Sequence, residues 1–328
     1  MPTHIVARIA FVLLLVSSWL LTSSMGAAQA TQPLRIVSLG ESWGPTPSDV
    51  GLRDGLAELG YRENEHYFLG IRFTQGDRAA LFTAARELVQ YQVDLIFTSN
   101  DRATKAAQMA TTQIPIVFAS VSDPVGIGVI ENFARPGGNI TGVAELALDL
   151  SPKRLQVFQE VIPGLRRVLF PYDGTDADAV KEATTYREAA RRLGIEFIEQ
   201  PVRTIEEARA ILTQVRKGEL DGVLAPRRCT LNIPGFVLEI IPPKGIPTMF
   251  DSAFWVERGA LVSYGQDFYD SGKQAARLVD KILKGAKPAE IPVEVNSKIE
   301  LTINLKTMSA TGLTIAPGML YQADRIVR

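Results

Sequence analysis

From residue 34 onward, short runs of apolar residues alternate with longer segments of helical periodicity. Segments 34–39, 67–73, 93–98 and 116–119 are predicted strands, and a helical pattern follows each of the first three. Repeated strand–helix–strand units place parallel strands side by side, with helices covering both faces of the sheet. The alternation therefore predicts an α/β fold.

The second half of the chain repeats this scheme. Its predicted strands are 168–172, 195–200, 221–225, 246–250 and 300–304, with a helix over 269–283. Ser151 followed by Pro152 predicts a helix start, because proline suits the first turn of a helix. The sequence thus predicts two lobes, each a doubly wound parallel sheet.

Composition limits the possible functions. The 328 residues suffice for two domains, and 46% hydrophobic with 22% charged residues is ordinary for a globular protein. A formal net charge of -1 gives no electrostatic case for binding nucleic acid or an anionic membrane. The single Cys229 excludes an internal disulfide and a thiolate metal cluster. Histidine chemistry would depend on His66, since His4 lies in a predicted leader.

The N-terminus resembles a secretory signal peptide. His4 and Arg8 precede an apolar core at 9–21, and Ala28-Gln29-Ala30 fits the small-x-small cleavage pattern. An uncleaved membrane anchor is the alternative, but the core is shorter than the roughly 20 apolar residues of a spanning helix. We expect a signal peptide over 1–30, cleavage after Ala30 and a periplasmic protein.

Known catalytic motifs are missing from the sequence. Gly40 at the end of the first strand is followed by Glu-Ser-Trp-Gly-Pro, which does not form a dinucleotide-binding turn. Neither a phosphate loop nor a Gly-x-Ser-x-Gly elbow occurs. Asp123 and Asp251 could act as paired acids, but the sequence does not fix their separation. We therefore predict a carrier that is not an enzyme and holds no cofactor and no metal.

Two long segments resemble one known family. Residues 120–142, SVSDPVGIGVIENFARPGGNITG, and residues 263–294 with 298–315 are similar to the tryptophan/tyrosine-type substrate-binding proteins of ABC transporters. The resemblance implies a type I periplasmic-binding-protein fold, a small-molecule ligand such as an amino acid between the lobes, an ABC permease as partner and a monomer. It also implies a three-segment hinge, with the first lobe at 31–141 and 266–287 and the second at 142–265 and 288–328.

One segment departs from the family pattern. Members usually carry a regular helix between the strands that end here at 225 and begin at 246. Pro234 and Gly235 would interrupt a long helix in this chain. Because this segment belongs to the cleft rim, the sequence does not decide which compound is the ligand.

Candidate ligand-binding residues follow from the fold. In parallel α/β lobes, the carboxyl ends of the strands and the N-termini of the following helices face the cleft. The first lobe contributes Ser42, Trp43, Ser99, Asn100, Ser120, Ser122 and Asp123, and the second lobe with its hinge contributes Tyr172, Asp173, Arg227, Asp251, Ser252 and Tyr264.

An amino-acid zwitterion would use these side chains in distinct ways. Ser99 and the amides that open the following helix would bind the carboxylate, and Asp251 or Asp123 the ammonium. Trp43 or Tyr264 would cover an apolar or aromatic side chain. Each residue also has a purely structural interpretation, as a helix cap, turn residue or packing group.

The predicted mechanism is hinge closure on the ligand, which favours the closed form through contacts to both lobes. Two alternatives remain open: a sensor that docks to a membrane receptor, and a secreted α/β enzyme. A transcription regulator with the same core would carry an N-terminal helix-turn-helix, where this chain has an export segment.

Overall fold

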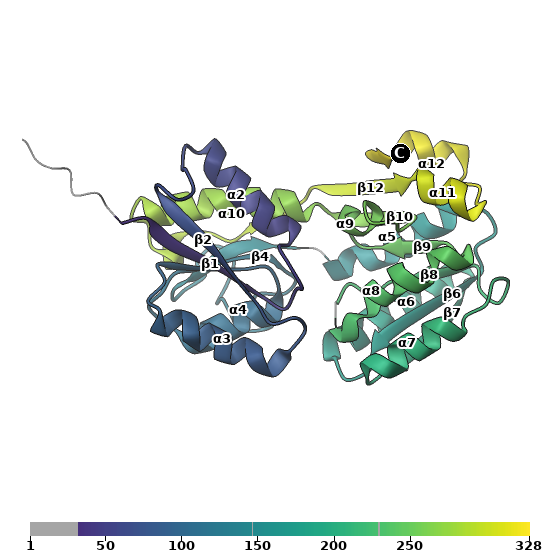
Figure 1. The fold of residues 1–328 in the computed structure, drawn as a ribbon, viewed down its shortest axis with the longest axis horizontal. Helices are drawn as coiled ribbons and strands as arrows, with labels where there is room; N and C mark the ends of the chain where they lie inside the picture. The colour runs from purple at the N-terminus through teal and green to yellow at the C-terminus, as the bar shows by residue number, and fades with distance from the viewer. Residues whose placement is uncertain (1–31, 146, 229) are drawn as a thin grey trace, which may run out of the picture. The chain divides into compact units, whose positions relative to one another are not determined.

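Two β-sheets with helices on both faces make up residues 34–328 in the computed structural model, which describes residues 32–145, 147–228 and 230–328 (Figure 1). This architecture confirms the predicted α/β class with two mainly parallel sheets. The predicted signal peptide, 1–30, lies outside the described residues.

The first sheet is parallel throughout, and its strands follow the order β11 (Glu294–Val295), β5 (Ile140–Ala144), β4 (Ile116–Val121), β3 (Leu95–Thr98), β1 (Leu34–Gly40) and β2 (Tyr67–Phe73). One face carries α2 (Pro47–Glu58) and α10 (Phe268–Leu283), and the other carries α3 (Arg78–Gln90) and α4 (Asp101–Ala110) (Figure 1). Ile116 and Phe118 pack under α3 and α4, whereas Val117 and Ala119 pack under α2 and α10. Burial on both faces explains the uninterrupted apolar run that predicted this strand.

The second sheet follows the order β13 (Arg325–Val327), β12 (Ile299–Asn304), β10 (Val262–Gln266), β9 (Thr248–Phe250), β8 (Gly222–Leu224), β6 (Arg167–Asp173) and β7 (Glu196–Val202). Neighbouring strands run parallel except β10 and β12, which are antiparallel. One face packs against α5 (Ala147–Val161), α6 (Ala177–Leu193), α11 (Leu305–Thr311) and α12 (Pro317–Gln322). The other packs against α7 (Ile205–Gln214), α8 (Ile233–Ile240) and α9 (Ala253–Val256). Short 3-10 turns lie at η1 (Thr230–Asn232), η2 (Pro242–Lys244) and η3 (Pro288–Glu290).

The division into lobes at 31–141 with 266–287 and at 142–265 with 288–328 remains a proposal. Both β5 and β11 pair within the first sheet. Their pairing argues for placing the first crossing after Ala144 and the last after Val295.

The helix predicted to begin at Ser151 starts earlier. Helix α5 begins at Ala147, so Pro152 lies inside it rather than in its first turn. The earlier start brings Leu150 into a buried position and leaves Ser151 fully buried. The cap prediction was wrong because burial of this turn outweighs the local preference of proline.

The segment between β8 and β9 has an irregular backbone. Leu231 and Asn232 both adopt left-handed conformations with φ of 52°. Helix α8 then spans only 8 residues, with Pro234 in its first turn. A long helix is interrupted here just before Pro234, as predicted from the proline, but Gly235 lies inside α8 and does not interrupt it.

Helices α2 and α10 approach each other unusually closely through glycines. A methyl group on Gly272 would lie 2.1 Å from the carbonyl oxygen of Ser48, and one on Gly51 would lie 2.0 Å from that of Tyr269. The Ser48 hydroxyl also donates a hydrogen bond to the carbonyl of Phe268 at 3.0 Å. Only glycine permits this backbone contact, which fixes the late helix α10 to the first lobe.

We expect Gly272→Ala to lower the free energy of unfolding by about 1–3 kcal/mol, because the added methyl group collides with fixed backbone. Gly318→Ala is the matched control, since a methyl group there meets no atom within 4 Å. Urea denaturation of both variants measures the difference. Equal stability of G272A and the parent protein would contradict the close packing.

Candidate functional site

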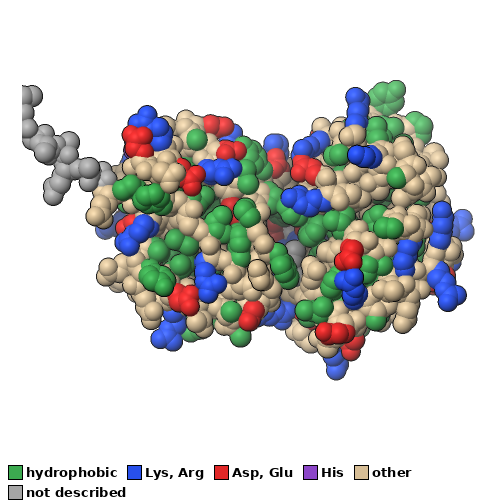
Figure 2. Space-filling view, viewed as in Figure 1, with side chains coloured by type: hydrophobic (Ala, Val, Ile, Leu, Met, Phe, Trp, Pro, Cys, Tyr) green, Lys and Arg blue, Asp and Glu red, His purple; other side chains and the backbone are tan. Residues whose placement is uncertain are grey.

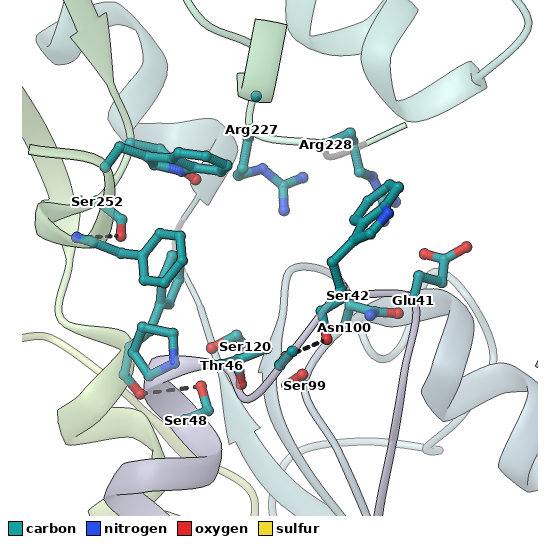
Figure 3. Close-up of a pocket in the computed structure, with 18 of the residues that line it drawn as sticks. Glu41, Ser42, Thr46, Ser48, Ser99, Asn100, Ser120, Arg227, Arg228 and Ser252 are labelled. Carbon is teal, nitrogen blue, oxygen red and sulfur yellow. Dashed lines mark hydrogen bonds between the residues drawn. The ribbon is translucent and has the colours of Figure 1, made fainter. Parts of the chain in front are cut away.

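A cavity of about 580 Å³ lies between the two lobes, where the carboxyl ends of strands from both sheets meet (Figure 3). The first lobe lines it with the loops after β1 and β3 and with the end of β4, and the second lobe with the loop after β8 and the end of β9. Figure 2 shows the surface hollowed at this place, with acidic and basic side chains around it. Strand ends of parallel sheets are the usual position for a ligand.

Most of the predicted ligand-binding residues do line this cavity. They are Ser42, Trp43, Ser99, Asn100, Arg227, Asp251 and Ser252, together with Ser120. Asn100 and Ser252 also cap α4 and α9, because their side chains accept hydrogen bonds from Ala103 N and Phe254 N. Asn100 and Ser252 therefore both cap a helix and line the cavity. Their contact with a ligand stays a prediction.

Ser122 and Asp123 lie outside the lining. The Ser122 hydroxyl donates a hydrogen bond to Glu145 Oε1 at 2.8 Å. Ser122 therefore holds the side chain of Glu145, which does line the cavity. Asp123 is exposed and accepts a hydrogen bond from Gly126 N at 2.8 Å. This carboxylate stabilises a turn, as its structural interpretation predicted.

Tyr172, Asp173 and Tyr264 also lie away from the cavity lining. Tyr172 is buried in the core of the second lobe and stacks on Phe170 at 5.6 Å between ring centroids. Tyr264 packs against the same core. Asp173 forms an ion pair with Arg78 of the first lobe instead. Tyr172 points inward because alternate residues of β6 face the helices α5 and α6.

Several lining residues were not predicted. Glu145, Arg228 and Thr230 join the charged part of the wall, and Trp255 joins the apolar part. Glu145 directly follows β5, so the strand-end argument could have identified it if the end of that strand had been predicted. Arg228 and Thr230 adjoin the predicted Arg227 in an irregular loop, where sequence periodicity gives no orientation.

Several aromatic rings line the cavity. Phe254 and Trp255 pack edge to face at 5.1 Å between centroids, and the Arg258 guanidinium lies 3.5 Å over the Phe254 ring. Trp43 is 51% exposed and rests on Gly76, where a methyl group would lie 2.9 Å from the indole. Such a wall suits the apolar or aromatic part of a ligand.

Buried charged side chains also line the cavity. Arg227 Nη1 lies 2.7 Å from Glu145 Oε1, and Arg227 N donates a hydrogen bond to Glu182 at 3.3 Å. Arg228 pairs across the lobes with Asp101 at 3.1 Å and also contacts Asp178. Each buried carboxylate here has a cationic neighbour, which is the condition for keeping charge away from water.

Burial controls the ionisation of these groups. It raises the pKa of Glu145 from 4.5 to about 7, although Arg227 opposes the shift; Asp101 reinforces it. Burial likewise raises the pKa values of Glu182 and Asp251, against the attraction of Arg227 and Arg154. Burial alone would lower the pKa of Arg227. The surrounding carboxylates, above all Glu145, raise this pKa by more than burial lowers it, so the guanidinium stays charged.

Further ion pairs join the rims of the two lobes. Arg102 contacts Asp176 of the second lobe and lies 3.4 Å from Glu41 of its own lobe. Arg78 pairs with Asp173 and lies 3.8 Å from Asp176. Both arginines are partly exposed, so each pair contributes little alone. Together they hold the rims in contact in this structure.

Possible metal ligands are not grouped together in the described residues. No group of three His, Cys, Asp or Glu side chains is arranged there to hold a metal ion. His66 is exposed, accepts a hydrogen bond from Arg62 N at 2.9 Å and lies outside the cavity lining. Among the helices of residues 32–145, 147–228 and 230–328, none is long and apolar enough to cross a membrane.

Comparison with known proteins gives consistent similarities. The sequence profile of the family described as "ABC transporter substrate binding protein" matches residues 46–327. A tyrosine-binding protein of Clostridioides difficile (strain R20291) is 24% identical over 262 residues, which cover 79% of this chain and 75% of that protein. A structure from Streptococcus pneumonia, an ABC domain in complex with L-Trp, has a TM-score of 0.78 and 24% identity over 90% of this chain and 100% of that one. A conserved domain protein from Vibrio cholerae has a TM-score of 0.78 and 25% identity over 89% of this chain and 99% of that one.

The raised pKa of Glu145 predicts a pH-dependent stability. Because its pKa is about 7 in the folded protein and 4.5 is its ordinary value, folding takes up a proton between these limits. The contribution of Glu145 to the free energy of unfolding should therefore fall as the pH rises from 4.5 toward 7, and stay level above that.

Urea denaturation at roughly pH 5, 6, 7 and 8 measures this slope. Glu145→Gln should reduce the slope, leaving the part that belongs to Glu182 and Asp251. An identical slope in E145Q and the parent protein would show that Glu145 does not change its protonation on folding.

Proposed function

Because the chain belongs to the family of ABC transporter substrate-binding proteins, we propose that it is an exported, monomeric protein that captures an amino acid between its lobes and delivers it to an ABC permease. The cavity lined by both lobes, which combines aromatic rings with buried charges, carries this proposal. An aromatic or apolar amino acid has the matching combination of an apolar side chain and a zwitterionic end.

The similar proteins support an amino-acid ligand. One of them is a tyrosine-binding protein, and another was crystallised with L-Trp. In this chain, Trp43, Phe254 and Phe268 would cover the ligand side chain, since all three line the cavity. Asp251 is the candidate for the ammonium, because it lines the cavity whereas Asp123 is exposed outside it.

Capture would proceed by closure of the lobes. A ligand that contacts Ser99 and Asn100 in the first lobe and Arg227 in the second favours the closed form by its contacts to both. The rim pairs of Arg78 and Arg102 would form as the lobes meet. The closed form would then be the form that the permease binds.

The ligand is tested by calorimetry with L-tyrosine and L-tryptophan, together with a sugar and an organic polyamine as unrelated solutes. We expect binding of at least one aromatic amino acid without its chemical conversion, as judged by recovery of the intact compound. Consumption of the solute would favour an enzyme, and binding of only the unrelated solutes would exclude an amino-acid carrier.

Tryptophan fluorescence locates the ligand. The sequence has Trp19, Trp43 and Trp255, of which Trp19 belongs to the predicted leader and the other two line the cavity. L-tyrosine should therefore change the emission of the exported protein, and Trp43→Phe and Trp255→Phe should each remove part of the change. Calorimetric binding with unchanged emission would place the ligand outside this cavity.

The leader is tested by expressing the full chain in a bacterial host and determining the N-terminus of the exported protein. We expect it to begin at Thr31, and we expect Ala30→Asp to block processing, because the cleaving enzyme requires a small residue there. An intact N-terminus in the membrane fraction of the parent protein would support the uncleaved anchor instead.

A further inference from the structure

Four buried polar atoms in the cavity wall have no hydrogen-bond partner among the described residues. They are Ser120 Oγ, Arg227 Nε, Arg228 Nε and Thr230 Oγ1. Ser120, Arg228 and Thr230 are each 7% exposed, and the side chain of Arg227 is 9% exposed. A buried polar atom without a partner destabilises the folded protein, so four around one cavity point to a group that binds there.

Ser120 is held in place by a strained backbone. Its φ is 59°, in the left-handed region that residues with a Cβ atom rarely adopt. The pairing of β4 with β5 shifts register between Ala119 and Val121, on either side of this residue. Strain of this kind is common where a side chain must be aimed at a functional site. Figure 3 shows Ser120 on the cavity wall, across the cavity from Arg227 and Arg228.

The two arginines are already anchored at their outer nitrogens. Arg227 Nη1 is paired with Glu145, and Arg228 Nη2 with Asp101 and Asp178. These pairs fix both guanidinium groups and leave each Nε–H without an acceptor. An Arg Nε–H can only donate, so its missing partner must be an acceptor atom. A ligand ammonium, which also only donates, cannot fill this position.

We propose that the ligand binds here through a carboxylate, which accepts hydrogen bonds from Arg227 and Arg228 Nε and from the hydroxyls of Ser120 and Thr230. This assignment rests on the proposed function and replaces Ser99 as the principal carboxylate contact. Ser120 belongs to the first lobe, and the other three residues belong to the loop after β8 in the second. The carboxylate therefore joins the two lobes and is the part of the ligand that closes them.

The hydroxyls offer a test with matched controls. Ser120→Ala and Thr230→Val remove them while keeping the Cβ atom, and Thr230→Val also keeps the side-chain volume. Ser263 and Thr74 also bury unpartnered hydroxyls, but they lie outside the cavity lining. Ser263→Ala and Thr74→Val are thus controls of the same chemistry. Arg227 and Arg228 are left intact, because removing either would leave a buried carboxylate without its partner.

Calorimetry with the exported protein uses L-tyrosine, tyramine, which lacks the carboxylate, and phloretic acid, which lacks the amino group. We expect L-tyrosine and phloretic acid to bind and tyramine not to bind. S120A and T230V should each weaken the binding of both acids by roughly tenfold or more, as for a hydrogen bond to a charged group. S263A and T74V should keep the affinity of the parent, and none of the four variants should lower the unfolding temperature of the empty protein.

The inference is overturned if tyramine binds as tightly as L-tyrosine, or if S120A and T230V keep the parental affinity. If neither L-tyrosine nor phloretic acid binds, the amino-acid ligand of the proposed function fails separately. The same variants are then measured with citrate, malate and benzoate. Binding that S120A and T230V weaken supports the carboxylate position, and failure of all three organic acids to bind overturns it.

Discussion

Burial of both sheet faces is the constraint on which the site depends. Strands such as β4 are covered by helices on either side, so their middle residues must be apolar. In β4 the polar residue Ser120 accordingly lies near the strand end, where the backbone turns toward the helices. Because the two sheets turn their carboxyl ends toward each other, polar groups at such strand ends collect around one cavity. The polar groups of the cavity therefore owe their position to the apolar packing inside the two lobes.

Within the cavity, the buried Arg228–Asp101 pair links the lobes electrostatically. Separating two such groups would leave each charge buried without its partner, which is strongly unfavourable, or would require water to enter. Residual attraction therefore favours contact between the lobes even before a ligand arrives. Arg227 forms a second buried pair beside it, with Glu145 just after β5.

The sequence was sufficient for features that depend on local pattern. Strand positions, the order of elements and lining residues such as Trp43 and Asp251 followed from periodicity and from strand ends. Tyr172 did not line the cavity, because the alternation along β6 turns it into the core. Arg228 was missed because a long side chain in an irregular loop reaches a partner that only the folded chain brings near. Contacts between distant segments, unlike periodicity, leave no local signal.

The packing of α10 on α2 has a consequence for how the chain folds. Leu52 and Leu56 of α2 belong to the same buried cluster as Ala276 and Val279 of α10. Until the ribosome has made α10, this apolar surface has no cover, and the first lobe cannot complete its core. Contacts of such long sequence separation form slowly. Delayed folding of this kind would suit the export proposed above, because an exported chain would cross the membrane before its first lobe completes its core.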